Sequence, residues 1–347
     1  MFRSLSHLYN VYKEKCLEEF PQKSKSFILS RFTFEKLFKD MNLALYQPKK
    51  DRCDVCVGFE LGNITEEDHK MHIKLKEEAR EEKDKDKKEA KENKCIVYSS
   101  DVQAVKLCPF LNASALYYKT KLNIHNFTMY NLASKDVQCF WFDETSAELV
   151  TSVFASCVID TLKTQFAKDP KPIVLWSDGC PPQNKNAVFA NALLHFAVAN
   201  KTTIEQKFLV KGHTRMECDS VHSTIETALK DMPIYLPSQY NEAALKARRI
   251  PFPYQSIYLS YSFFKDFSQQ NTLIYDSIRP GSRKGDPTVY DIVAIRYKPN
   301  RKIETKLNFK SNYEELPRRP RSNNFTSEFF PLYQNKLPIK TSKYNHL

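Results

Sequence analysis

The chain has 347 residues, of which 41% are hydrophobic and 27% charged, and its formal net charge is +12 at pH 7. That length allows one large domain or two to three small ones, and the composition is that of an ordinary globular protein. The positive charge favours a polyanionic partner such as nucleic acid, because Lys and Arg neutralise phosphates. A basic surface that serves only solubility is the alternative.

Cysteine usage and the N-terminal residues predict a reducing compartment. The nine cysteines are scattered, and only Cys53 and Cys56 are closely paired. The opening string "MFRSLSHLYNVYKEKC" carries charges through its apolar positions, so it is not a secretory segment. No window approaches the ~20 uninterrupted apolar residues needed to cross a bilayer. We therefore expect a nuclear or cytoplasmic protein with no membrane partner.

The first two predicted segments cover residues 1–50 and 51–94. Apolar residues at helical spacing predict a helical region over residues 1–50, either a helix-turn-helix remnant or a helical cap on the next domain. In the second segment, Cys53-x2-Cys56 and His69-x2-His72 supply four ligands at a spacing close to that of structural Zn²⁺ sites. The alternative is a turn beside two surface histidines. The mixed charges of residues 70–94 predict a solvated helix that acts as a spacer.

The third segment, residues 95–235, has an α/β pattern. Three aromatic and β-branched strands come first, followed by alternating helices and strands in the order β, β, β, α, β, α, β, α. This order predicts a mixed sheet flanked by helices. Residues 236–347 are expected to form a C-terminal helical and β module, followed by the basic tail "LPRRPRSNNF".

Two aspartates end apolar strands in the third segment. Asp101 follows "CIVYSS" and Asp178 follows "KPIVLWS". If these strands are parallel neighbours, their carboxylates converge at one edge of the sheet, where ligands of open α/β sheets bind. Gly179 and the two prolines after it end the second strand. Each aspartate taken singly could instead be a helix cap or turn former.

A third carboxylate is expected from the string "KGHTRMECDSVHSTIE". Asp219 begins the helical run, and Glu217 and Glu226 stay open as alternatives. Three carboxylates suit two hard divalent cations about 3.5–4 Å apart, which activate water or a 3′-hydroxyl in phosphodiester chemistry. Mg²⁺ is the expected ion, and Mn²⁺ should replace it.

Four polar side chains near these carboxylates are further candidates. His213 and His222 flank Asp219 and could position phosphate or assist proton transfer, although a lone histidine also serves local hydrogen bonds. Asn184 and Asn186 could orient a carboxylate or contact a nucleotide, and a helix cap is the alternative.

Several strings are specific enough to indicate a family. "RFTFEKLFKDMNLALYQPKKDRCDVC", "LCPFLNASALYYKTKL", "WSDGCPPQNKN" and "KGHTRMECDSVHSTIE" together resemble uncharacterised insect proteins encoded by transposable elements, which carry a domain of unknown function. The likeness covers most of the chain and extends to "SIRPGSRKGDPTV". Members of such families are often longer at the N-terminus, so a missing DNA-binding region is one open alternative for this chain.

The element order is similar to the RNase H-like fold of DDE-type transposases and integrases, which implies a five-stranded mixed sheet. In those enzymes the third acidic residue lies on the helix after the fifth strand, which corresponds to Asp219 or Glu226 here. The string "DSVH" is similar to the Asp-x-x-His strings of some transposases and favours Asp219. The resemblance implies catalytic Asp101, Asp178 and Asp219.

Three functions follow as expectations. The first is a nuclear DNA transposase or integrase that uses Mg²⁺ or Mn²⁺. A homo-oligomer would be compatible with this activity. The second is a catalytically inactive transposon relic that binds nucleic acid or acts as a scaffold through its zinc element and basic tail. The third is an RNase H-fold nuclease that acts on RNA or on a hybrid, since the sequence does not separate DNA from RNA.

Overall fold

The computed structural model describes residues 5–21, 27–41, 43, 45, 52–111, 113–116, 118–269, 272–317, 325–326 and 328–346. The chain divides into two compact units, residues 1–57 and 58–347, and each is described by itself. Among the described residues, no helix is long and apolar enough to cross a bilayer.

The first unit contains two helices within the predicted helical region, α1 (Leu5–Glu19) and α2 (Arg31–Asp40). Ser30 caps α2, because its hydroxyl accepts a hydrogen bond from the backbone nitrogen of Thr33 at 3.2 Å. The rings of Tyr9 and Tyr12 lie 5.4 and 5.1 Å from the ring of Phe34, between centroids. Aromatic contacts between the two helices therefore hold this hairpin together.

Two helices follow, α3 (Asp54–Glu60) and α4 (Glu66–Lys91), and the division between the units falls inside α3. Thr65 caps α4 through the backbone nitrogen of Asp68, at 3.1 Å. The predicted solvated spacer is wrong, because one side of α4 is buried. The buried residues of α4 are Glu78, Ala79, Lys83, Asp86 and Ala90.

Charged side chains hold α4 on the sheet. Lys207, only 3% exposed, donates to Asp86 at 2.9 Å and to Glu82 at 2.6 Å. The indole nitrogen of Trp176 also donates to Asp86, to its Oδ2 atom, at 2.8 Å. Buried charges of this kind need partners, and α4 supplies them. The charged residues of α4 therefore include some that face the sheet, although their alternating signs predicted a solvated helix.

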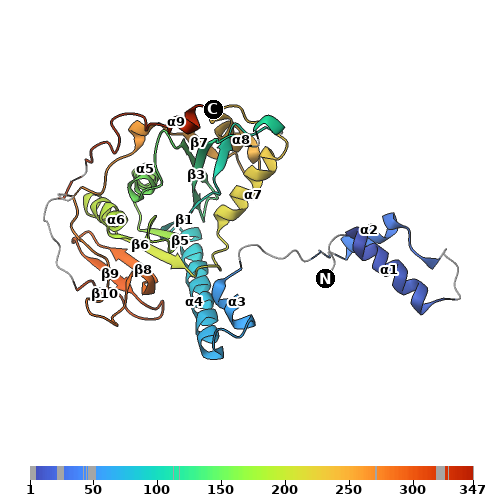
Figure 1. The fold of residues 1–347 in the computed structure, drawn as a ribbon. Helices are drawn as coiled ribbons and strands as arrows, with labels where there is room; N and C mark the ends of the chain where they lie inside the picture. The colour runs from blue at the N-terminus through green and yellow to red at the C-terminus, as the bar shows by residue number, and fades with distance from the viewer. Residues whose placement is uncertain are drawn as a thin grey trace. The chain divides into compact units, whose positions relative to one another are not determined.

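One mixed sheet organises the second unit (Figure 1). Its strands are β1 (Ile96–Val102), β2 (Lys106–Cys108), β3 (Leu122–Asn131), β4 (Val137–Asp143), β5 (Ile173–Asp178), β6 (Ile204–Leu209), β7 (Gln255–Tyr258), β8 (Ala294–Tyr297), β9 (Ile303–Lys306) and β10 (Glu314–Glu315). The helices of this unit after α4 are α5 (Thr151–Lys168), α6 (Ala187–Ala199), α7 (Glu217–Leu229), α8 (Ser238–Ala247) and the short α9 (Thr341–Tyr344). Three 3₁₀ turns complete the elements, η2 (Ser114–Leu116), η3 (Tyr261–Phe263) and η4 (Val289–Asp291).

The strand order is β10-β9-β8-β6-β5-β1-β3-β4-β7, and β2 pairs with β3. Strands β1, β5 and β6 are parallel, whereas β3 is antiparallel to both β1 and β4. The mixed α/β architecture is confirmed, but the sheet has ten strands where five were predicted.

The sheet has two apolar faces because side chains alternate along each strand. In β5, Ile173 and Leu175 pack with α5 and α6 in the largest core cluster. Val174 and Trp176 point to the opposite face, where they pack with residues of α4 and the start of α7. Helices therefore cover both faces, which explains the continuous apolar run of this strand.

The C-terminal strands extend the central sheet. β8 pairs with β6 in antiparallel register, and the hydroxyl of Tyr297 donates to Gln206 at 2.7 Å. The small separate β module expected here is therefore part of the main sheet. Most of the basic tail "LPRRPRSNNF" lies outside the described residues, which omit 318–324.

Candidate active site

Asp101 and Asp178 occupy equivalent positions on neighbouring parallel strands. Ser99 of β1 is in register with Trp176 of β5, and each aspartate lies two residues farther along its own strand. Because side chains repeat every second residue, both carboxylates lie on the sheet face that carries Trp176. This register agrees with the prediction that the two carboxylates converge where the parallel strands end.

Burial and mutual repulsion disfavour the ionised form of Asp101. Desolvation, the charge of Asp178 and then that of Asp219 raise the pKa of Asp101 to about 7. Burial also raises the pKa of Asp178, although hydrogen bonds from Asn184 and from the Cys180 backbone act in the opposite direction. A carboxylate with a raised pKa in a cleft, beside other carboxylates, is typical of a site that binds a cation.

Asp219, exposed in the first turn of α7, groups with Asp101 and His222, whereas Asp178 is not a member of this group. One ligand atom from each of Asp101, Asp219 and His222 lies within 4.8 Å of the others. A spacing of three residues places Asp219 and His222 on the same side of the helix. Asp219 also accepts a hydrogen bond from the backbone nitrogen of Met216 at 2.8 Å, which fixes the start of α7.

The imidazole of His222 is neutral at pH 7. Burial, the largest effect, lowers the pKa of His222 to about 4. Its Nε2 atom lies 3.0 Å from the hydroxyl of Thr128 on β3. A neutral, oriented imidazole beside two carboxylates could serve as a metal ligand or accept a proton.

The other two acidic candidates on α7 are paired elsewhere. Glu226 forms an ion pair with Lys106 and accepts a hydrogen bond from Gln103 at 2.8 Å. Glu217 forms ion pairs with Lys83 and Lys87 of α4, at 2.6 and 3.4 Å. These partners leave Asp219 as the α7 carboxylate that lies with Asp101.

Two asparagines in the loop after Asp178 have different roles. The amide nitrogen of Asn184 donates to Asp178 at 3.1 Å, so it orients that carboxylate. The amide oxygen of Asn184 is buried and has no hydrogen-bond partner among the described residues. Asn186 caps α6, because its side-chain oxygen accepts from the backbone nitrogen of Phe189 at 3.0 Å. Both alternatives considered for these residues therefore occur, one at each asparagine.

A cavity of about 830 Å³ opens at this edge of the sheet. Asp101 and Asp178 line it together with two lysines, Lys185 and Lys211. Lys185 is buried, donates to the carbonyl oxygen of Tyr290 at 3.1 Å, and has a pKa that desolvation lowers to about 8. The cavity therefore combines carboxylates with cationic groups that could contact phosphate.

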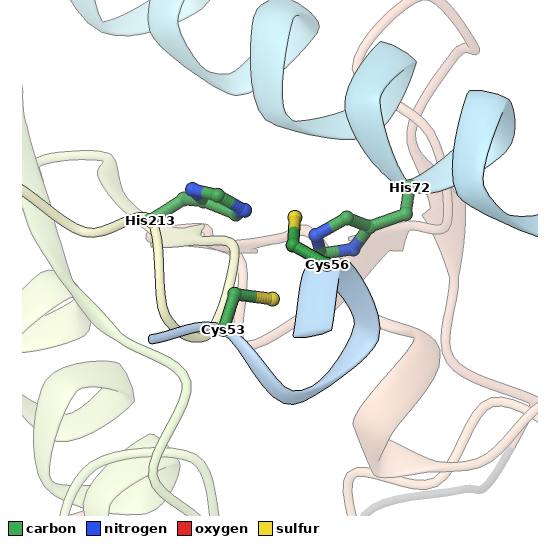
Figure 2. Close-up of side chains that lie close together, drawn as sticks. All are labelled: Cys53, Cys56, His72 and His213. Atoms are coloured by element: carbon green, nitrogen blue, oxygen red, sulfur yellow. The ribbon is translucent and has the colours of Figure 1, made fainter. Parts of the chain in front are cut away.

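The predicted zinc ligands are rearranged in the structure. His69 stacks on Phe59, with ring centroids 4.1 Å apart, whereas the ring of His72 lies 5.0 Å from that of His213. The cluster of possible ligands contains Cys53, Cys56, His72 and His213, whose ligand atoms all lie within 4.8 Å of one another (Figure 2).

His213 is therefore grouped with the cysteines and His72, and not with Asp101 and Asp219 as a catalytic residue. No local pattern indicates this pairing, because His213 belongs to the loop between β6 and α7, far along the chain from His72. The Gly212 beside it has φ +76°, a conformation that favours glycine, and marks a tight turn in that loop.

The comparisons with known proteins identify one domain. Residues 84–243 match the family model of a domain of unknown function (DUF8701). No curated protein and no solved structure matches the chain. The matched range contains Asp101, Asp178, Asp219 and His222, so the candidate active site lies inside this domain.

Proposed function

We propose that the chain is a metal-dependent phosphodiester-transferring enzyme of the transposase or integrase type, with Asp101, Asp178 and Asp219 as ligands of Mg²⁺ or Mn²⁺. One observation carries this proposal. Burial, and then the charges of Asp178 and Asp219, raise the pKa of Asp101, which lines a cavity together with Asp178. A bound divalent cation would relieve that repulsion, and oxygen ligands of this kind suit Mg²⁺.

The order of elements supports an RNase H-like core. Strands β1, β3 and β4 come first, and α5, β5, α6, β6 and α7 follow. This is the β, β, β, α, β, α, β, α order of that fold, with acidic residues at the ends of the first and fourth strands and on the last helix. The additional strands β7 to β10 lie at the edges and leave this core order intact.

Groups around the carboxylates fit a hydrated cation. Within the described part of the chain, the buried amide oxygen of Asn184, next to Asp178, has no hydrogen-bond partner and could accept a hydrogen bond from a water molecule. When bound, Mg²⁺ would supply charge for the attacking and leaving oxygens of the phosphodiester. The three aspartates would hold the ion, and His222, whose pKa is lowered by burial and which lies beside Asp219, could accept a proton from the attacking hydroxyl.

In the proposed reaction, water or a DNA 3′-hydroxyl attacks the phosphorus atom and forms a new phosphorus–oxygen bond. The bond to the leaving 3′-oxygen breaks, and the proton of the attacking group passes to a base. Lys185 and Lys211 line the cavity and would contact the backbone phosphates, consistent with the net charge of +12.

The test is nicking and strand transfer on double-stranded DNA with Mn²⁺ or Mg²⁺. Asp101→Asn, Asp178→Asn and Asp219→Asn should each reduce the rate by at least about 100-fold, as loss of a charge-stabilising group does. Asp291→Asn, at the rim of the same cavity, and Glu226→Gln are matched controls that should retain activity. Activity that survives Asp178→Asn would refute the assignment. Parallel assays on RNA and on a hybrid duplex identify the nucleic acid.

The capping role of Asp219 favours a second candidate, a non-catalytic nucleic-acid-binding relic, because that carboxylate already has a structural task. This candidate predicts binding that weakens with salt but does not respond to divalent metal or to the three aspartate variants. Binding that requires Mg²⁺ and is lost in Asp178→Asn would exclude it.

A further inference from the structure

We propose that Cys53, Cys56, His72 and His213 hold a structural zinc ion, and that His69 is not a ligand. The ligand atoms of these four residues lie within 4.8 Å of one another, and Figure 2 shows the side chains gathered around a common space. Tetrahedral zinc with two sulfur and two nitrogen ligands requires separations of roughly 3.3–3.8 Å between ligand atoms. The observed upper limit of 4.8 Å means that small side-chain shifts would bring the four ligand atoms to these separations.

Three short elements supply the ligands. Cys53 and Cys56 lie at the start of α3, where the backbone nitrogen of Val57 donates to the carbonyl oxygen of Cys53 at 3.0 Å. Their spacing of three residues places both thiols on one side of this turn. His72 lies near the start of α4, and His213 follows the turn at Gly212.

The chemistry of the set selects zinc over the ions proposed for the carboxylates. Two thiolates and two imidazoles are soft or borderline ligands, which Mg²⁺ does not prefer. The two cysteines are not joined in a disulfide. Four protein ligands leave no open position, so the site is structural.

Residue spacing alone suggests His69 as a zinc ligand, but its ring is stacked on Phe59. The two rings are 4.1 Å apart and nearly parallel, at 2°. A ring in that position is held by its apolar contact. His72, one helical turn away, has His213 as its neighbour instead.

Zinc at this position would fix the loop between β6 and α7. His213 lies six residues before Asp219, and the intervening Met216 is the residue whose backbone nitrogen Asp219 caps. The ion would thus hold one end of a loop whose other end starts the helix with the candidate catalytic residues. The zinc proposal itself does not depend on the proposed enzyme activity.

The test is the zinc content of the 347-residue chain, purified without added chelator, by elemental analysis. We expect one zinc per chain in the wild type and in the control His69→Ala. His213→Ala should lose the ion or bind it more weakly by well over the roughly 10–100-fold that outer-shell changes cost. Zinc retained in His213→Ala and lost in His69→Ala would overturn the proposed ligand set, and a zinc-free wild type that also fails to bind added zinc would overturn the site.

A second variant keeps the test decisive if His213→Ala does not fold. His213→Cys replaces one zinc ligand by another, so it should keep one zinc per chain. Cobalt substituted into this variant should show stronger thiolate-to-metal absorption than cobalt in the wild type, because a third sulfur is added. An unchanged cobalt spectrum would show that position 213 is outside the coordination shell. Because no nucleic acid is involved, these results are separate from those of the nicking assay.

Discussion

Replacing Asp101 by asparagine should make the metal-free protein more stable at neutral and alkaline pH, although it removes a candidate catalytic group. The carboxylate is half-buried, and desolvation together with the charges of Asp178 and Asp219 disfavours its ionised form in the folded state. Asparagine has nearly the same shape but carries no charge, and it removes this repulsion.

The magnitude follows from the pKa. In the folded protein the pKa of Asp101 is about 7, against an ordinary value of 3.8. Between these values the folded state binds the proton more tightly than the unfolded state, so the free energy of unfolding falls as pH rises. At about 1.4 kcal/mol for each pH unit, the total cost approaches about 4 kcal/mol above pH 7 as an upper bound. Below about pH 4 the proton is bound in both states and the cost disappears.

The assay is urea unfolding of wild type and Asp101→Asn from pH 5 to pH 8.5, with a chelator present. The stability advantage of the variant should widen up to about pH 7 and then stay constant. Asp291→Asn is the matched control, because hydrogen bonds from Thr288 lower the pKa of Asp291, so removing that charge should destabilise the protein. An advantage of Asp101→Asn that does not change between pH 5 and pH 7, or a less stable variant at pH 8, would refute the reasoning.

Three further predictions concern the metal, the buried ion network and the loop after β5. Because Mn²⁺ must displace the proton of Asp101, the affinity of the protein for Mn²⁺ should fall by up to about tenfold per pH unit below pH 7. Calorimetry in buffers of different ionisation enthalpy measures this dependence. An affinity that does not change from pH 5 to pH 7 would contradict the prediction. Lys207→Met leaves the buried Asp86 and the half-buried Glu82 without their cation and should cost about 3–5 kcal/mol of unfolding free energy in urea, more than Glu82→Gln, which removes one partner only. Asn186→Ala removes the cap of α6 and should lower the free energy of unfolding by about 1 kcal/mol. Asn184→Ala should leave stability nearly unchanged and weaken Mn²⁺ binding. Equal effects of the two changes on Mn²⁺ binding would contradict these separate roles.

The sequence predicted the strand-end carboxylates because local signals were strong there. Apolar runs followed by Asp101 and Asp178 indicate buried strands that end at a polar group, and parallel neighbours bring such ends together. The choice of Asp219 among three acidic residues needed the structure, since the ion pairs of Glu217 and Glu226 come from α4 and from the segment around β2.

Long-range pairings account for what the sequence did not predict. The charges of α4 alternate in the manner of an exposed helix, and only the tertiary contact with Lys207 makes Asp86 an inward-facing residue. The neighbour of His72 comes from a distant loop, so cysteine and histidine spacing favoured His69 instead. The pairing of β8 with β6 joins residues that are remote in sequence, which no local periodicity reports.

The place of β8 beside β6 also determines which part of the chain can be studied by itself. The matched domain of unknown function ends at residue 243, before β8 begins, and it starts inside α4. A fragment of residues 84–243 would keep the three aspartates but expose the backbone of β6 as a free sheet edge, which promotes aggregation. It would also lack Tyr290, Ile292 and Val293, which line one side of the cavity. The smallest useful fragment is therefore set by the completed sheet and extends well beyond the range defined by sequence similarity.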